Sequence, residues 1–91
     1  MEPKEILIKA RKLIEDPENW IQGRFYHEGA YCGVGALVAA GASTSEQPLE
    51  SHPAYTRLLK VLNYPSFTVF NDTHTHTEVL EIFDRAIASF D

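Results

Sequence analysis

The sequence predicts a compact α+β domain, mainly helical, with about four helices and a short β-hairpin. Two observations predict this class. Apolar residues recur at the three- and four-residue spacing of amphipathic helices in several stretches. Residues 20–31 are instead rich in aromatic residues and interrupted by glycine, which favours two short strands or a loose hairpin with its turn at "HEG". The 91 residues are expected to form one globular domain over 1–91.

The first helix is expected over residues 3–16. Pro3 suits a first helical turn, where the amide proton has no partner within the helix. Asp16 precedes Pro17, and the residue before a proline is disfavoured in the helical region, so the helix should end there. The apolar stripe of this helix consists of Ile6, Leu7, Ala10, Leu13 and Ile14.

Residues 32–41, "CGVGALVAAG", predict a helix of small residues. Such a helix lets its neighbours approach closely, so we expect it to be central in the fold. Val34, Leu37 and Val38 can share one of its faces, and Gly41 is expected to end it as a C-cap. The glycines inside it weaken a helix by about 1 kcal/mol each relative to alanine, and close packing is expected to offset that cost.

The middle of the chain predicts a polar loop, a helix and an extended segment. Residues 42–52 are polar and form the loop. A helix follows over residues 53–62, with Ser51 or His52 as its N-cap and a proline in the first turn. Residues 67–70, "FTVF", are expected to form a brief strand or an extended packing segment.

The last helix is expected over residues 76–90, and its start is well marked. Thr75 and Glu78 match a capping box, in which the threonine hydroxyl accepts from the N3 amide and the glutamate side chain reaches back. The chain contains no internal repeat. The apolar stripe of the last helix consists of Val79, Leu80, Phe83, Ile87 and Phe90.

Composition limits the classes of partner and location. The net charge is −5, with eight Lys and Arg against thirteen Asp and Glu, so we expect no nucleic-acid binding. Cys32 is the one cysteine, which excludes an intramolecular disulfide. No signal peptide is expected, and the longest stretch of low polarity, residues 30–42, is too short to cross a bilayer. A cytoplasmic protein without membrane association is therefore expected.

The stretch "FNDTHTHTEVL", residues 70–80, invites a metal or ligand interpretation. His74 and His76 flank the N-cap and should diverge, and no further ligands occur at a recognisable spacing, so we expect no metal and no cofactor. Asn71 and Asp72 are typical of an Asx turn, bonding the backbone two residues on. As an alternative, these four side chains could bind a small anion or nucleotide beside the start of the last helix.

Cys32 supports two interpretations. At a helix N-terminus the dipole favours the thiolate, and a thiol-dependent hydrolase or transferase would pair it with a histidine, such as His74, and with Asn71 or Asp72. These four are the candidate catalytic residues, although their order and spacing match no thiol-hydrolase signature. The alternative is a buried cysteine that serves as a small apolar side chain.

The aromatic residues Trp20, Phe25, Tyr26 and Tyr31 are candidates for core and hairpin packing. Where they remain exposed, they would form a patch suited to a protein partner, and a homo-oligomer through the same patch could form. The two other histidines, His27 and His52, are expected on the surface.

The order of these motifs resembles a family of small proteins of unknown function from bacteria and their phages. Members carry a tryptophan after the first helix, a Cys-x-x-Gly-Ala-Leu segment, and a Phe/Trp-Asn-Asp segment before a final helix. The resemblance implies that Cys32 and Asn71-Asp72 share one corner of the fold, and it implies no activity. The matching residues are Trp20, Cys32, Gly35, Ala36, Leu37, Phe70, Asn71, Asp72, Val79, Leu80, Ala86 and Ile87.

The sequence therefore favours a small acidic binding or regulatory module over an enzyme. Its partner would be a protein or a small ligand, and a phage-encoded or mobile-element-encoded inhibitor or accessory protein fits this description. The acidic balance should steer it toward basic surfaces. The candidate binding residues are Trp20, Phe25, Tyr26, Tyr31, Asn71, Asp72, His74 and His76.

Overall fold

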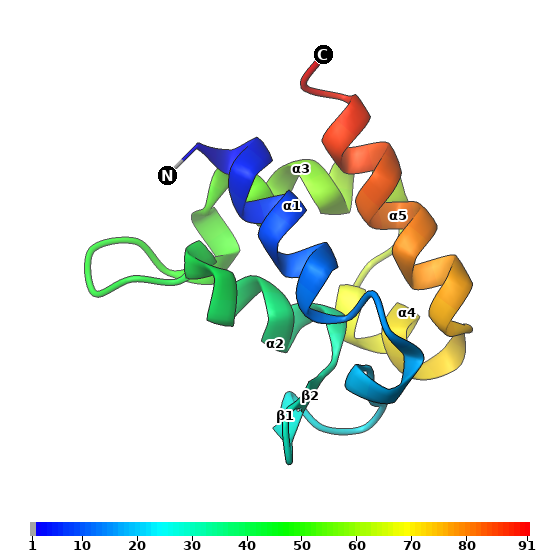
Figure 1. Ribbon diagram of the computed structural model, residues 1–91. Helices are drawn as coiled ribbons and strands as arrows, with labels where there is room; N and C mark the ends of the chain where they lie inside the picture. Colours follow the sequence, from blue (N-terminus) through cyan, green and yellow to red (C-terminus); the bar gives the residue numbers. More distant parts are fainter. Residues whose placement is uncertain (1) are drawn as a thin grey trace.

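Five α-helices and one β-hairpin make up the fold, which a computed structural model describes for residues 2–91 (Figure 1). The two strands pair antiparallel, with Tyr26 opposite Tyr31. This arrangement confirms the predicted mainly helical α+β class. The helices are α1 (Pro3–Leu13), α2 (Gly33–Leu37), α3 (Pro53–Leu62), α4 (Phe67–Thr73) and α5 (His76–Ala88). The strands are β1 (Tyr26–His27) and β2 (Ala30–Tyr31), and the short turns are η1 (Pro17–Asn19), η2 (Val38–Ala42) and η3 (Leu49–Ser51).

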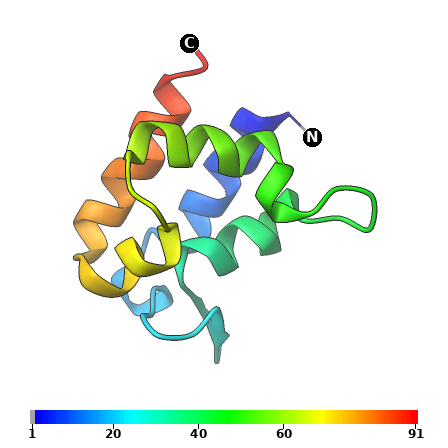
Figure 2. The ribbon, with the colours of Figure 1, turned by 180° about the vertical axis from the view of Figure 1, so that it is seen from behind.

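The core lies where α1, α2, α3 and α5 meet. Helix α1 packs against α5, α2 and α3, and α3 also packs against α5. Figure 2 shows α3 and α4 on the side of the molecule opposite α1. Both termini lie at the end of the molecule away from the hairpin. The rings of Phe67 and Phe83, both fully buried, meet edge to face with centroids 5.6 Å apart and tie α4 to α5. None of the helices within residues 2–91 is long and apolar enough to cross a membrane.

Helix α1 ends earlier than the predicted residue 16. It stops at Leu13, with Ile14 as its C-cap. Asp16 then caps the turn η1, because its carboxylate accepts a hydrogen bond of 2.9 Å from the amide of Glu18. Asp16 and Pro17 therefore begin a new turn, as their side chains favour, and do not extend the helix.

Residues 67–70 are helical, so the prediction of a strand or extended segment is wrong. They begin α4, whose N-cap Ser66 accepts a hydrogen bond of 3.3 Å from the amide of Val69. The buried side chains Phe67, Phe70 and Asn71 have the i, i+3, i+4 spacing of one helical face. A helix of only seven residues hides this pattern, because its apolar residues can also be read as an alternating strand.

Helix α2 is central, as predicted, and its glycines mark two close approaches. A Cβ atom on Gly33 would lie 2.5 Å from the ring of Phe67, and one on Gly35 would lie 1.9 Å from the backbone oxygen of Phe25. Neither position accepts a side chain without movement of a neighbour. The helix continues into η2, inside which Gly41 has a φ of 111°; the C-cap of η2 is Ser43, two residues beyond the glycine that was predicted to end the helix.

The starts of α3 and α5 are capped as the sequence predicts. His52 is the N-cap of α3, and its Nδ1 accepts from the amide of Ala54 at 3.1 Å. His52 is buried, so the prediction of a surface position is wrong for it, whereas His27 is exposed. In the capping box of α5, Thr75 Oγ1 accepts from the Glu78 amide at 3.2 Å, and Glu78 Oε1 accepts from the Thr75 amide at 2.9 Å. Hydrogen bonds from Thr75 lower the pKa of Glu78.

Candidate functional site

The side chain of Asn71 is fully buried, and each of its hydrogen-bonding positions is occupied. Its Oδ1 accepts from Trp20 Nε1 at 2.7 Å and from the amide of Gly33 at 2.9 Å. Its Nδ2 donates to the backbone oxygen of Ile21 at 3.0 Å and to Asp72 Oδ1 at 3.3 Å. An amide side chain has two donors and two acceptor lone pairs, so no polar position remains for a ligand.

Neighbouring contacts complete this polar cluster, which we term the Asn71 corner: Trp20, Gln22, Asn71 and Asp72. Gln22 Nε2 donates to the backbone oxygens of Asn71 at 3.1 Å and of His74 at 3.0 Å. Asp72 Oδ1 accepts from the amide of Gly23 at 2.9 Å. The expected Asx turn is wrong, because Asn71 and Asp72 bond the loop 20–24, far away in sequence, from within α4.

His74 and His76 point to different partners, as expected across a helix cap. The ring of His74 stacks on Phe70, with centroids 3.8 Å apart, and its Nδ1 lies 2.9 Å from the Phe70 backbone oxygen. His76 Nε2 donates to the backbone oxygen of Ile14 at 2.6 Å, and its ring lies 5.5 Å from that of Trp20. Within residues 2–91, no three His, Cys, Asp or Glu side chains are grouped as metal ligands.

Cys32 caps α2, but its environment favours the neutral thiol. The residue is only 2% exposed, and its Sγ accepts from the amide of Gly35 at 3.3 Å. Burial raises the pKa of the Cys32 thiol, and the amides of Gly35 and Val34 offset this only in part. No hydrogen bond within residues 2–91 joins Cys32 to a histidine. A hollow of about 100 Å³ beside it is lined also by Arg24, Thr68 and Asp72, so a carboxylate and not an imidazole shares this wall with the thiol.

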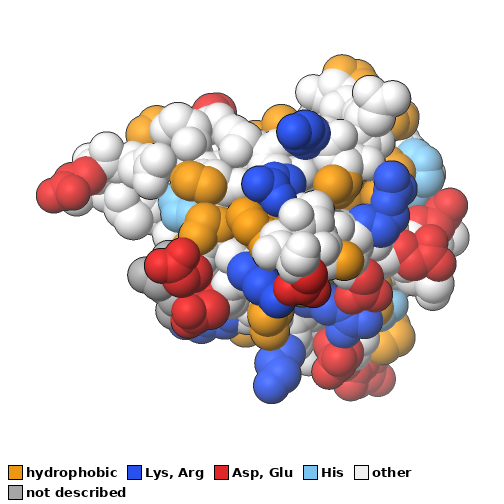
Figure 3. Space-filling model, turned by 90° about the horizontal axis from the view of Figure 1, so that it is seen from above, with side chains coloured by type: hydrophobic (Ala, Val, Ile, Leu, Met, Phe, Trp, Pro, Cys, Tyr) orange, Lys and Arg blue, Asp and Glu red, His pale blue; other side chains and the backbone are white. Residues whose placement is uncertain are grey.

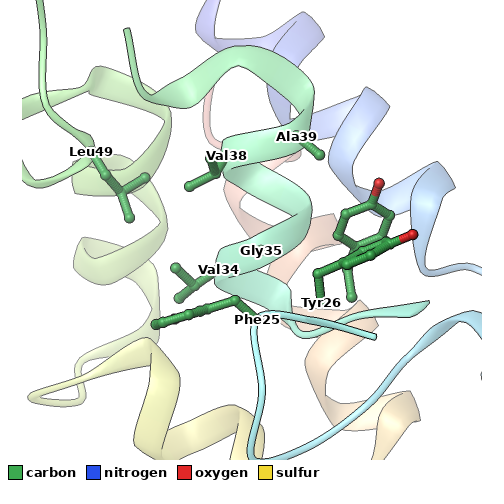
Figure 4. Close-up of a pocket in the computed structure, with 8 residues that line it drawn as sticks. Phe25, Tyr26, Val34, Gly35, Val38, Ala39 and Leu49 are labelled. Carbon is green, nitrogen blue, oxygen red and sulfur yellow. The ribbon is translucent and has the colours of Figure 1, made fainter. Parts of the chain in front are cut away.

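An apolar concavity of about 390 Å³ lies between the hairpin and the α2–η2 helix (Figure 4). Figure 4 shows Phe25 beside Val34 on one side of the helix, facing toward Leu49, while Tyr26 lies on the other side. We term this concavity the aromatic groove. Its lining residues are Phe25, Tyr26, Tyr31, Val34, Gly35, Val38, Ala39 and Leu49.

The aromatic groove leaves large apolar side chains in solvent. Phe25 is 59% exposed, Tyr26 is 57% exposed and Val38 is 45% exposed. The rings of Tyr26 and Tyr31 lie 5.0 Å apart and tilted, so they brace each other across the hairpin. Trp20 does not belong to the groove, because its indole is half-buried in the Asn71 corner.

Sequence reasoning found the three hairpin aromatics of the groove but missed its helical wall. Val38 was expected to share the face of Leu37, which is fully buried, yet Val38 points to solvent. Val34 and Val38 are four residues apart and do share a face, and this spacing was the available signal. Leu49 had no such signal, because the tertiary fold alone brings the turn η3 beside α2.

Backbone contacts link the Asn71 corner to the groove. The corner holds residues 20–24, and the next residue, Phe25, accepts a hydrogen bond from the amide of Cys32 at 3.3 Å. Ile21 donates to the backbone oxygen of Tyr31 at 3.1 Å. Because Gly35 has no side chain, Phe25 can lie directly on α2. The corner therefore positions the aromatic groove through the backbone.

A profile described as "Family of unknown function (DUF6197)" matches residues 1–89, almost the whole chain. The chain belongs to DUF6197. The resemblance to a family of unknown function is confirmed at this level. No curated protein and no solved structure matches this DUF6197 chain.

Proposed function

We propose that this DUF6197 protein is a binding module that captures an apolar segment of a partner protein in the aromatic groove. The observation that supports this proposal is the exposure of Phe25, Tyr26 and Val38 around one apolar concavity. Exposed apolar residues scattered singly are normal on protein surfaces, whereas a contiguous apolar patch around a concavity is typical of an interaction site. Aromatic side chains are also enriched among the residues that dominate binding energy.

The backbone of Phe25 takes part in the contacts that hold the fold together, whereas its ring is left largely exposed to solvent. The backbone oxygen accepts from Cys32 and lies against Gly35, whereas the side chain is more than half exposed. Covering the exposed parts of Phe25, Tyr26 and Val38 would contribute roughly 1 kcal/mol each. Binding of a partner in the groove is therefore favoured by burial of apolar surface that stays in solvent in the isolated chain.

The contacts favour a binding module over the two other interpretations. A thiol-dependent enzyme needs an accessible thiolate and a base, but Cys32 is buried and its pKa is raised. An anion site at the start of α5 needs free donors, but the side chain of Asn71 is fully bonded and the rings of His74 and His76 contact backbone oxygens. A cytoplasmic accessory or inhibitory role, in the bacterial or phage setting that the resemblance implies, is part of this proposal.

Photo-crosslinking in cells of the native host tests the proposed module. The photoreactive residue p-benzoylphenylalanine replaces Tyr26 or Val38 in the groove, and Glu81, exposed on α5, in the control. We expect adducts from positions 26 and 38 that are absent from position 81. A second change in the same chain, Phe25→Ser, should remove them by reducing the apolar area. Identical adducts from all three positions, or none from the two groove positions, would contradict the proposal.

A further inference from the structure

We infer that the segment bound in the aromatic groove is cationic: a stretch of a partner protein whose apolar side chains are flanked by lysine or arginine. The inference rests on the proposed function, since it names the class of partner for that same groove. The evidence for a cationic segment is the distribution of charged residues along the chain and over the surface.

The net negative charge of the protein falls in the middle of the chain, in a stretch that includes the segment that builds the groove. Residues 13–56 supply all the groove-lining residues, and Arg24 is their one Lys or Arg. Residues 1–12 and 57–91 together carry seven cations and seven acids, so the whole formal charge of −5 belongs to residues 13–56. The six acidic side chains of that segment are Glu15, Asp16, Glu18, Glu28, Glu46 and Glu50.

All six acids are exposed, and three of them, Glu28, Glu46 and Glu50, lie within three positions of a residue that lines the groove. Glu28 occupies the hairpin turn, two residues after Tyr26. On the side of η3, Glu50 directly follows Leu49, and Glu46 precedes it in the same connection. The negative field of Glu50 acts on its surroundings, since it adds to burial in raising the pKa of Tyr55.

The cations outside this segment all lie on α1, α3 and α5. Figure 3 looks onto the end of the molecule that carries both termini and shows several Lys and Arg side chains toward the middle of that face. The hairpin lies at the opposite end. Two of these cations are already paired with acids of the C-terminal region, Lys4 with Asp91 and Arg11 with Asp84.

The negative charge at the hairpin turn and beside Leu49 selects partners for the groove. It attracts a segment rich in lysine or arginine and accelerates its encounter with the groove. It disfavours a second copy of this chain, because self-association through the groove would bring the same negative charge of two copies together. It disfavours nucleic acids and anionic membranes for the same reason.

Titration calorimetry with defined peptides tests the inference on the purified protein. The probe is a short leucine–lysine peptide of helical periodicity, compared with a leucine–glutamate peptide of the same pattern and with a serine–lysine peptide that lacks apolar side chains. We expect only the leucine–lysine peptide to bind. Its affinity should fall between about 0.1 M and about 1 M salt, where the screening length drops from about 10 Å to about 3 Å.

Two pairs of variants separate charge from apolar contact. Glu46→Gln with Glu50→Gln should weaken the peptide roughly three- to tenfold, whereas Glu5→Gln with Glu81→Gln, which removes the same charge elsewhere, should not. Val38→Ser should weaken it about fivefold. Val69→Ser is its matched control, because Val69 is 48% exposed, on α4.

The outcomes distinguish this inference from the proposed function. If the leucine–glutamate peptide binds as tightly, and Val38→Ser weakens it, the cationic partner is overturned and the groove module stands. If the leucine–lysine peptide binds but Val38→Ser and Val69→Ser have equal effects, both are overturned. No binding to the wild type overturns the inference. A dimer in sedimentation velocity that is lost in Val38→Ser assigns the groove to a second copy, which also overturns it.

Discussion

The Asn71 corner and the aromatic groove differ in whether their side chains remain free to bind a partner, and in each the outcome is the opposite of what the residue types suggest. The corner contains the amide, carboxylate and indole groups that usually mark a ligand site, yet the amide of Asn71 and the indole of Trp20 are bonded within the chain. The groove contains residues typical of a core, yet Phe25 and Tyr26 are mostly in solvent. A candidate site is therefore better identified by the groups that folding leaves without partners than by residue type.

The physical reason is the high cost of a buried polar group without a partner. Such a group destabilises the fold by about 1–3 kcal/mol, so polar residues drawn into the interior are bonded there. Exposing an apolar ring costs less per residue, and the fold can leave a few in solvent. The two regions therefore respond to mutation in different ways.

The largest expected effect is at the corner. Asn71→Ala leaves the indole nitrogen of Trp20 and the amide of Gly33 without an acceptor and the oxygen of Ile21 without a donor. We expect the free energy of unfolding to fall by about 3–5 kcal/mol, as measured by urea denaturation followed by circular dichroism. Asn19→Ala, at an exposed position, should change it by less than about 0.5 kcal/mol. Equal effects of the two substitutions would show that the corner is not a structural centre.

An intermediate loss of stability is expected for substitutions where the hairpin side of the groove contacts α2. Gly35→Ala places a Cβ atom against the backbone oxygen of Phe25, so the hairpin must move. We expect a loss of about 1–3 kcal/mol in stability, together with shifted amide resonances in residues 25–31. The matched change Gly33→Ala meets the ring of Phe67 instead, so it should destabilise the core and leave the hairpin resonances close to wild type. Unchanged hairpin resonances in Gly35→Ala would contradict the observed approach.

The smallest expected effect on stability concerns Cys32, the N-cap of α2, whose backbone amide bonds to Phe25 at the groove. Burial raises the pKa of its thiol, so the neutral form is favoured in the folded protein. Its contribution to stability is fully present below the unfolded thiol pKa of about 8.5 and is lost as the pH rises through the higher folded value. Alkylation by iodoacetamide at about pH 7 to 9 should be much slower in the folded protein than in urea.

The control for alkylation is Val38→Cys, which adds an exposed thiol in the groove of the same molecule. Peptide mapping by mass spectrometry then compares the two thiols directly, and position 38 should react first. Rapid reaction of Cys32 in the folded state below about pH 8 would instead favour the thiol-dependent interpretation.

Local signals predicted the elements that local chemistry controls. The capping box at Thr75 and Glu78 and the hairpin turn each depend on residues within a few positions, and both occur. Gly41 does adopt a left-handed conformation, but the helix is capped two residues later, at Ser43. The prediction failed for α4, which is too short for its periodicity to stand out. The exposure predicted for His52 was also wrong: the residue was expected as a possible N-cap on the surface, and it caps α3 but is buried.

By itself, the sequence determined the helical class, the starts of α3 and α5 and the acidic balance, because these follow from spacing, caps and charge. The tertiary structure alone decided which side chains are bonded within the chain and which remain exposed for a partner. The side chain of Asn71 forms hydrogen bonds with Trp20 and Ile21, about fifty positions away. Val38 faces solvent beside Leu49. In both cases only packing brings the segments together. Long-range contacts leave no local pattern, and so the availability of a side chain appears only in the folded molecule.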